Sequence, residues 1–243
     1  MGELTKVGII HALAKAFRYA RYLEICTSTT GNHFGEIDHE TFELAHRMMY
    51  RWHAGFDDGH PSEYCTDASA SDVLVQEVRS RGRAYDVILV DGWHEYDNAF
   101  NDLTSALSLL RPGGTVVVHD CMPPDAEHAT PEHHNGPWCG VSYEAFLDVV
   151  LATNSLLYLT VDTDYGCGII QKADPYAYFP AQDPSRDRAI AGWRSRERDA
   201  ATSFEYFQAH RKDLLNTIDA GDFDAKRLPF SVAPLARHQR ELQ

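Results

Sequence analysis

Basic residues are scarce in this sequence. Its 22 lysines and arginines are outnumbered by 36 aspartates and glutamates, which gives the 243-residue chain a formal net charge of −14. Binding to the phosphates of nucleic acids requires a concentrated basic surface, and an anionic membrane attracts the same kind of surface. The charge balance therefore argues against nucleic acid and against a membrane as partners.

Long apolar runs are absent as well. No segment approaches the roughly 20 consecutive apolar residues that a membrane-spanning helix needs. The N-terminal residues do not resemble a signal peptide, because His11, Lys15 and Arg18 interrupt the apolar positions. The five cysteines include no closely spaced CxxC pair, which favours reduced thiols. Together these absences predict a cytoplasmic protein.

The most informative pattern lies between Tyr85 and Cys121. A short β-branched run ends at Asp91, a helical pattern follows, and a Pro-Gly-Gly turn leads into a second run that ends at His119 and Asp120. The apolar positions of the helix recur at helical spacing and are Tyr96, Phe100, Leu103, Leu107 and Leu110. Strand, helix and strand joined in this way predict a parallel βαβ unit.

Both strands of this unit end in polar residues. Parallel sheets of this kind bind ligands beyond the carboxyl ends of their strands. Residues 91–94 and 119–121 are therefore expected to face one crevice, which makes them the first candidates for a functional site.

The remainder of the chain continues the alternation of helices and strands. The expected elements are a helix at 4–18, a strand at 19–25, an ambiguous apolar segment at 42–52, a strand at 64–66, helices at 71–81 and 142–151, antiparallel strands at 155–161 and 166–172, and one charged helix at about 185–217. We expect residues 1–175 to form one domain and residues 176–243 a helical extension that packs on it or on a partner subunit.

Three motifs carry a family resemblance, and they are YLEICTSTTG at 22–31, YDVILVDG at 85–92 and LLRPGGTVVVHD at 109–120. They are similar to the first, fourth and fifth strands of the class I S-adenosylmethionine-dependent methyltransferases. The pair DGxHxY and HDC resembles a subgroup often found with antibiotic, sugar or polysaccharide biosynthesis. The resemblance implies a Rossmann-like α/β fold: a mostly parallel seven-stranded sheet with an antiparallel last strand and helices on both faces.

The resemblance also implies where S-adenosylmethionine would bind. The implied contacts, at the ends of the first, third and fourth strands, are Glu24, Cys26, Thr27, Ser28, Thr30, Gly31, Asp67, Asp72, Asp91, Gly92 and Trp93. The alternative for residues 27–30 is that they cap the next helix, and Asp72 suits the first turn of a helix equally well. The chain departs from the family at Cys26, which replaces a loop glycine, and at 42–52, which ends without an acid for the ribose.

His94, His119 and Asp120 are the candidate catalytic residues. Methyl transfer to oxygen requires the acceptor hydroxyl to lose its proton, and a histidine that titrates near neutral pH is a natural base. The alternative is a divalent cation, Mg²⁺ or another, that lowers the pKa of this hydroxyl. In that case the expected ligands are Asp91, His119 and Asp120, with His94 as the alternative imidazole.

The sequence therefore predicts an S-adenosylmethionine-dependent methyltransferase. We expect O-methylation of a small polar or sugar-like acceptor, in secondary metabolism or glycan modification, and a homo-oligomer through the C-terminal helix. The altered cofactor loop and the missing ribose acid leave an alternative open, a metal-dependent hydrolase or a non-catalytic binder of nucleotide-type ligands on the same fold.

Overall fold

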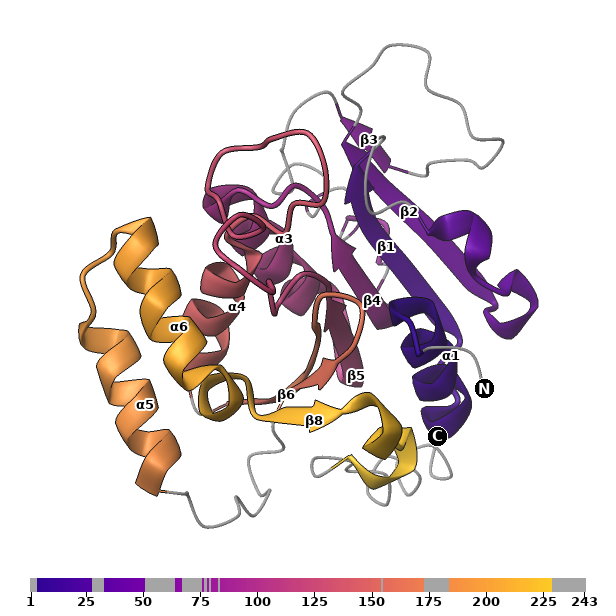
Figure 1. Ribbon diagram of the computed structural model, residues 1–243. Coiled ribbons are helices and arrows are strands. Elements are labelled where there is room, and N and C mark those ends of the chain that lie inside the picture. The colour runs from indigo at the N-terminus through magenta and orange to yellow at the C-terminus, as the bar shows by residue number, and fades with distance from the viewer. Residues whose placement is uncertain are drawn as a thin grey trace.

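The structure is a computed structural model of the 243-residue chain. It describes residues 4–27, 33–50, 64–66, 76, 78, 80–82, 84–153, 155–172 and 184–228. In this part of the chain one sheet runs through the molecule, with helices on both of its faces (Figure 1).

The sheet has eight strands in the order β3-β2-β1-β4-β5-β7-β6-β8. Their bounds are Arg21–Thr27 (β1), Leu44–Tyr50 (β2), Tyr64–Thr66 (β3), Tyr85–Asp91 (β4), Leu110–Val118 (β5), Leu156–Asp162 (β6), Cys167–Lys172 (β7) and Thr217–Asp219 (β8). The first five are parallel, and β7 is antiparallel to both β5 and β6. The predicted mostly parallel sheet with an antiparallel strand is confirmed, while β8, which pairs with β6, was not predicted.

Helices cover the two faces of the sheet. Their bounds are Lys6–Phe17 (α1), Tyr96–Leu109 (α3), Ser142–Leu151 (α4), Pro184–Ser195 (α5) and Ala200–Leu215 (α6), with short 3-10 turns at 34–36, 39–41, 220–222 and 225–227. One face packs against α3 and α4, and the other packs against α1. The predicted helices on both faces are therefore confirmed.

Strand β4 shows why the sheet has two cores. All of its residues are buried, as expected for a central parallel strand whose two faces are both covered. Successive side chains point to opposite faces, so Ile88 and Val90 join the core under α3 and α4. Val87 and Leu89 join the core under α1. This packing fixes the direction of the strand and hence the place of Asp91 at its carboxyl end.

The ambiguous segment at 42–52 is a strand in its central part, because β2 pairs along its length with β1 and also with β3. The helix expected at 71–81 lies largely outside the described residues. The single helix expected at 185–217 is wrong: α5 and α6 are separate, and the side chain of Asp199 accepts a hydrogen bond from the Thr202 amide at 3.0 Å to cap α6. An N-cap of this kind starts a second helix, whereas the apolar spacing alone predicts a single continuous helix.

The helical hairpin α5–α6 packs beside α4, as Figure 1 shows. Trp193 of α5 and Phe207, Leu214 and Leu215 of α6 belong to the same hydrophobic core as Phe146 of α4. The core that covers this face of the sheet therefore includes side chains from beyond residue 175. The division of the chain into two domains at that point remains a prediction.

Two further observations concern the sequence expectations. Among the helices of the described residues, none combines the length and the hydropathy that crossing a bilayer requires. Cys26, Cys121, Cys139 and Cys167 are buried free thiols, so none of these four forms a disulfide.

Candidate functional site

The strand order creates a switch point between β1 and β4. After β1 the chain builds β2 and β3 on one side, and with β4 and β5 it continues on the other side. Open α/β sheets form their ligand crevice beyond the carboxyl ends of the strands at such a point. Cys26 and Asp91 are register partners there. The turn between β6 and β7 reaches the same edge, because β6 and β5 are both antiparallel to β7 and so run in the same direction.

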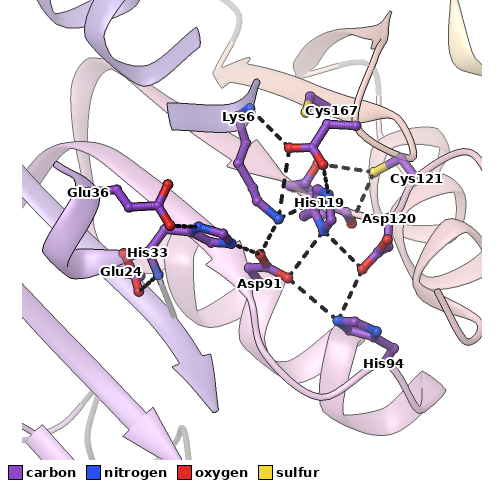
Figure 2. A network of polar contacts seen from close by, with 12 residues as sticks. Lys6, Glu24, His33, Glu36, Asp91, His94, His119, Asp120, Cys121 and Cys167 are labelled. Carbon is purple, nitrogen blue, oxygen red and sulfur yellow. Dashed lines mark hydrogen bonds and ion pairs between the residues drawn. The ribbon is translucent and has the colours of Figure 1, made fainter. Parts of the chain in front are cut away.

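Four side chains meet at this edge, and we call Asp91, His94, His119 and Asp120 the strand-end cluster (Figure 2). His94 Nε2 lies 3.2 Å from Asp120 Oδ2 and 3.6 Å from Asp91 Oδ1. His119 Nδ1 lies 3.0 Å from Asp120 Oδ2 and 3.3 Å from Asp91 Oδ1. All four residues are buried. The structure thus brings together both strand ends that the sequence singled out.

Two nitrogens of the cluster have short contacts but no hydrogen bond. His94 Nε2 and His119 Nδ1 are buried and have no hydrogen-bond partner among the described residues. Both nitrogens lie against the carboxylates of Asp91 and Asp120, so each pair is close without being aligned. A buried polar atom without a partner is rare in proteins and calls for an explanation, such as the binding of an ion.

The arrangement of the cluster fits a divalent cation. Asp91, His94 and Asp120 each offer one ligand atom, and these atoms lie within 4.8 Å of one another. Carboxylate oxygens and an imidazole nitrogen are suitable ligands for such a cation. His119, the imidazole that the sequence analysis placed in the ligand set, approaches the same carboxylates through Nδ1 but turns Nε2 away from them.

The ring of His94 is held by the loop at 122–141. Its Nδ1 lies 2.8 Å from the carbonyl oxygen of Trp138, which can only accept, so Nδ1 carries a proton. In the neutral ring Nε2 is then an unprotonated acceptor that faces two carboxylates. Such a contact is favourable only if the ring is protonated or a cation lies between them, and histidine ligands of metals are commonly oriented by this kind of carbonyl contact.

A glycine makes the close approach to His94 possible. Gly140 has a φ of +57°, and a Cβ at this position would lie 2.3 Å from the carbonyl oxygen of His94. The next residue, Val141, donates its amide hydrogen to that same carbonyl at 2.9 Å. The loop is therefore fixed directly to the backbone of the cluster.

The opposite charges in the cluster shift one another's pKa values so that each charged form is stabilised. Burial alone would raise the pKa of Asp91, but His119 and Lys6 outweigh it and hold that pKa well below its usual value. Burial would also raise the pKa of Asp120, but His119 and His94 outweigh it and lower that pKa. For His119 burial would lower the pKa, yet Asp91 and Asp120 raise it well above its usual value. Without another cation the site favours anionic carboxylates and a cationic imidazole.

Sequence reasoning missed Lys6 and Asp164. Lys6 is 6% exposed, and its Nζ lies 2.9 Å from Asp91 Oδ2 and 3.1 Å from His119 Nε2. Asp164 Oδ1 lies 3.2 Å from His119 Nε2. Lys6 lies on the buried side of α1 together with Ile10 and Leu13, so a lysine on an apolar stripe was the available signal. For Asp164 the signal was a hairpin turn at the carboxyl edge of the sheet.

Glu24 is a residue of β1, the strand on the other side of the switch point from β4. It accepts hydrogen bonds from the Tyr22 hydroxyl at 2.8 Å and from the His33 amide at 3.0 Å. Burial raises its pKa to about 7, despite these two hydrogen bonds. His33 Nε2 lies 3.8 Å from Asp91 Oδ2, so His33 connects the surroundings of Glu24 with the strand-end cluster (Figure 2).

The other expected cofactor contacts are only partly described. Cys26 and Thr27 are buried at the end of β1, and Gly92 is buried beyond β4. Burial raises the pKa of the Cys26 thiol well above its usual value, so this cysteine is a neutral packing residue. The candidates that lie outside the described residues are Ser28, Thr30, Gly31, Asp67 and Asp72.

Aromatic rings border the cluster on two sides. The ring of Trp93 lies 4.9 Å from that of Trp138 and 5.0 Å from that of His133. On the other side the ring of Tyr165 lies 5.9 Å from His128 and 6.4 Å from His119. We call the rings of Trp93, His128, His133, Trp138 and Tyr165 the aromatic rim. It contains Tyr165, the one large hydrophobic side chain exposed in the described part, at 42%.

Tyr165 is held in this position by a constrained turn. Asp164 and Tyr165 have φ angles of 49° and 58°, in the left-handed region that side chains other than glycine seldom adopt. Met122 donates its amide hydrogen to the Tyr165 carbonyl at 2.8 Å, which ties the turn to the loop that follows β5. Strained backbone of this kind is concentrated at functional sites.

Comparison with known families gives one match by sequence. Residues 11–121 match a family model described as a methyltransferase domain. The matched segment contains β1, β4, β5 and the complete strand-end cluster. No curated protein matches the chain.

Several solved structures are similar at low identity. The O-methyltransferase TomG from Streptomyces achromogenes, involved in tomaymycin synthesis and solved with SAM, is 18% identical over 70% of this chain and 80% of that chain, with a TM-score of 0.49. An O-methyltransferase from Bacillus cereus in complex with SAH is 14% identical over 70% and 80%, with a TM-score of 0.44. The MycE methyltransferase of the mycinamycin pathway, with Mg, SAH and mycinamycin VI, is 15% identical over 71% and 50%, with a TM-score of 0.43. Values this low do not show what this chain binds, so the functional argument depends on the family match and on the site.

Proposed function

We propose that this chain is a class I S-adenosylmethionine-dependent methyltransferase, in keeping with the match of residues 11–121 to a methyltransferase domain, and that it methylates a hydroxyl group of a small polar or sugar-like acceptor. The observation that carries this proposal is the strand-end cluster. Two carboxylates and two imidazoles lie buried together beside the switch point of the sheet, where a methyl donor and an acceptor hydroxyl would meet.

The cofactor would occupy the crevice between β1 and β4. When bound there it supplies an electrophilic methyl group to the acceptor. Glu24 offers a carboxylate for the ammonium of the cofactor, because its two hydrogen bonds leave further lone pairs free. Cys26 and Thr27 line the end of β1, and Gly92 and Trp93 follow Asp91 at the end of β4.

The acceptor hydroxyl must lose its proton as it attacks. His94 Nε2 faces the space between Asp91 and Asp120 and carries no proton in the neutral ring, so His94 is placed to take that proton. Mg²⁺ or another divalent cation held by Asp91, His94 and Asp120 would supply a lowered pKa of the hydroxyl. With the cation bound, its charge would favour the neutral form of His119, whose Nδ1 would then take the proton while Nε2 donates to Asp164.

The aromatic rim gives the acceptor its place. Rings of Trp93 and Trp138 adjoin the His94 side, and the exposed ring of Tyr165 adjoins the His119 side. Flat apolar surfaces of this kind suit the ring of a sugar or another cyclic compound. The net charge of −14 disfavours an anionic acceptor. A neutral or cationic hydroxylated ring compound is therefore the proposed acceptor class.

The proposal is tested by ligand binding. S-adenosylhomocysteine should raise the melting temperature of the wild-type protein, since a ligand selective for the native state stabilises it by about 2.7 kcal/mol at 100 times its Kd. Asp91→Ala should abolish this shift, and Asp222→Asn, an exposed aspartate in a 3-10 turn, should retain it. No shift in the wild type at millimolar ligand, together with a shift by divalent metal alone, would instead favour the metal-dependent hydrolase.

A further inference from the structure

We propose that Lys6 is a permanent cation beside the strand-end cluster and sets the affinity of the cluster for a divalent metal ion. Its ammonium occupies one oxygen of Asp91 and leaves the other oxygen to the exchangeable cation. The proposal extends the metal site of the proposed function to a residue that lies before the matched segment of the family, residues 11–121. Lys6 would therefore be a tuning residue that does not itself bind the substrate.

The two oxygens of Asp91 have different surroundings. Oδ2 lies 2.9 Å from Lys6 Nζ, in an ion pair whose two side chains are both almost completely buried. Oδ1 faces the imidazoles of His94 at 3.6 Å and His119 at 3.3 Å. Figure 2 shows Lys6 and His94 on opposite sides of Asp91. Oδ1 is the Asp91 oxygen that faces His94, with which Asp91 and Asp120 form the group of ligand atoms.

The N-terminal helix is fixed so that Lys6 cannot easily withdraw. The Lys6 amide donates to Asp164 Oδ2 at 3.2 Å, and the Thr163 hydroxyl donates to the carbonyl of Leu4. The Lys6 ammonium also lies 3.9 Å from Asp164 Oδ2. Asp164 therefore holds the first residue of α1 through its backbone and offsets part of the charge on its side chain. The start of α1 is in this way a part of the site.

The charge on Lys6 has a definite consequence for a metal ion. A fixed positive charge a few ångströms from a divalent cation repels it, and burial reduces the screening by water. Lys6 also shares the negative charge of Asp91 with the metal. The metal should consequently bind more weakly than the ligand set alone would allow. Removing the positive charge should tighten binding, whereas a loss of structure would weaken it.

Isothermal titration calorimetry of the full chain with MgCl₂ alone tests this inference. Lys6→Met should bind Mg²⁺ at least about tenfold more tightly than the wild type, given the size of a Coulomb interaction at this range. Lys6→Arg, which keeps the charge, should stay close to the wild-type Kd. Lys15→Met makes the same substitution at an exposed position of α1 and should change nothing.

A second variant moves the affinity in the opposite direction. Asp164→Asn removes a negative charge beside Lys6 at a position outside the ligand group, so Mg²⁺ should bind several-fold more weakly. If Lys6→Met is unstable, Lys6→Gln removes the charge and keeps a hydrogen-bond donor for Asp91. Circular dichroism establishes that each variant is folded before titration.

The outcomes separate this inference from the proposed function. An unchanged or weaker Mg²⁺ affinity in a folded Lys6→Met or Lys6→Gln variant overturns the role of Lys6, as does an absence of Mg²⁺ binding in every variant. Binding of S-adenosylhomocysteine by the wild type is measured in parallel. Failure of that binding alone would refute the methyltransferase proposal and leave the effect of Lys6 on the metal intact.

Discussion

Strand β4 carries a buried aspartate near each end, and the two have different partners. At the amino end Asp86 Oδ2 accepts hydrogen bonds from the amides of Ala20 and Arg21, at 2.9 and 3.0 Å, and its Oδ1 pairs with Arg111 at 3.2 Å. At the carboxyl end Asp91 is surrounded by the ionisable side chains of the strand-end cluster and by Lys6.

The difference shows that burial alone does not distinguish a structural aspartate from a functional one. Asp86 accepts hydrogen bonds from backbone amides and an arginine, which keep their hydrogens at any ordinary pH, and in this way it joins two strands. Asp91 faces imidazoles that gain and lose protons, and two of their nitrogens lack hydrogen bonds. A buried acid with permanent donors supports the fold, whereas one among titratable and unsatisfied groups is placed for chemistry.

The largest effect should follow from a change beside Asp91. His94→Gln should lower the rate of methyl transfer by about 10²–10⁴-fold, the range for losing a positioned proton acceptor. Binding of S-adenosylhomocysteine should stay near the wild-type value, because His94 lies on the side of Asp91 away from Glu24 (Figure 2). The measurement is transfer of labelled methyl from S-adenosylmethionine to a panel of hydroxylated ring compounds.

A histidine remote from the site serves as the control for that experiment. His210→Gln on α6, whose ring packs against Tyr206, should transfer methyl groups at the wild-type rate. Equal rates for His94→Gln and the wild type, with an acceptor that the wild type methylates, would remove His94 from the proposed chemistry.

Glu24 sharpens the comparison, because it is a buried acid that accepts hydrogen bonds from two neutral donors, the Tyr22 hydroxyl and the His33 amide. Its pKa rises from 4.5 to about 7, chiefly through burial. Its contribution to stability is therefore complete below about pH 4.5, declines as pH rises, and is lost above pH 7. The loss amounts to about 3 kcal/mol, from 1.36 kcal/mol per pKa unit.

Glu24→Gln should remove this dependence. The free energy of unfolding, measured in urea from pH 4.5 to 8, should fall more steeply for the wild type than for the variant. The difference between the two curves isolates Glu24 from the histidines that titrate in the same range. Parallel curves would show that Glu24 has an ordinary pKa in the folded protein.

The same contrast explains how much the sequence could predict. The β-branched runs that end at Asp91 and at His119 identify two parallel strands, and their carboxyl ends must share one edge, so the meeting of these residues follows from topology. Lys6 and Asp164 could not be placed by this reasoning, because each comes from an element remote in sequence. Their approach to Asp91 and His119 depends on how α1 docks and where the β6–β7 turn lies.

Other errors and omissions have a local cause. The single helix expected at 185–217 is two helices, because apolar spacing continues across a break that only the cap at Asp199 reveals. Strand β8 follows immediately after α6 and is short, and its pairing with β6 has no alternating pattern to announce it. Short edge strands depend on tertiary contacts more than on their own sequence.

The smallest effects should come from the amino end of β4. Asp86→Asn should lower the free energy of unfolding by about 2 kcal/mol, since hydrogen bonds to a charged group contribute on this scale and the amide cannot replace all of them. Arg111→Gln should cost less than about 1 kcal/mol, because Arg111 is 42% exposed on its side chain and the two backbone amides remain paired with Asp86. Neither change should alter the affinity for S-adenosylhomocysteine under conditions where the variant is folded. Urea unfolding and calorimetric titration measure the two quantities separately, and a loss of ligand affinity without a loss of stability in Asp86→Asn would mean that the two ends of β4 do not differ in the way their partners imply.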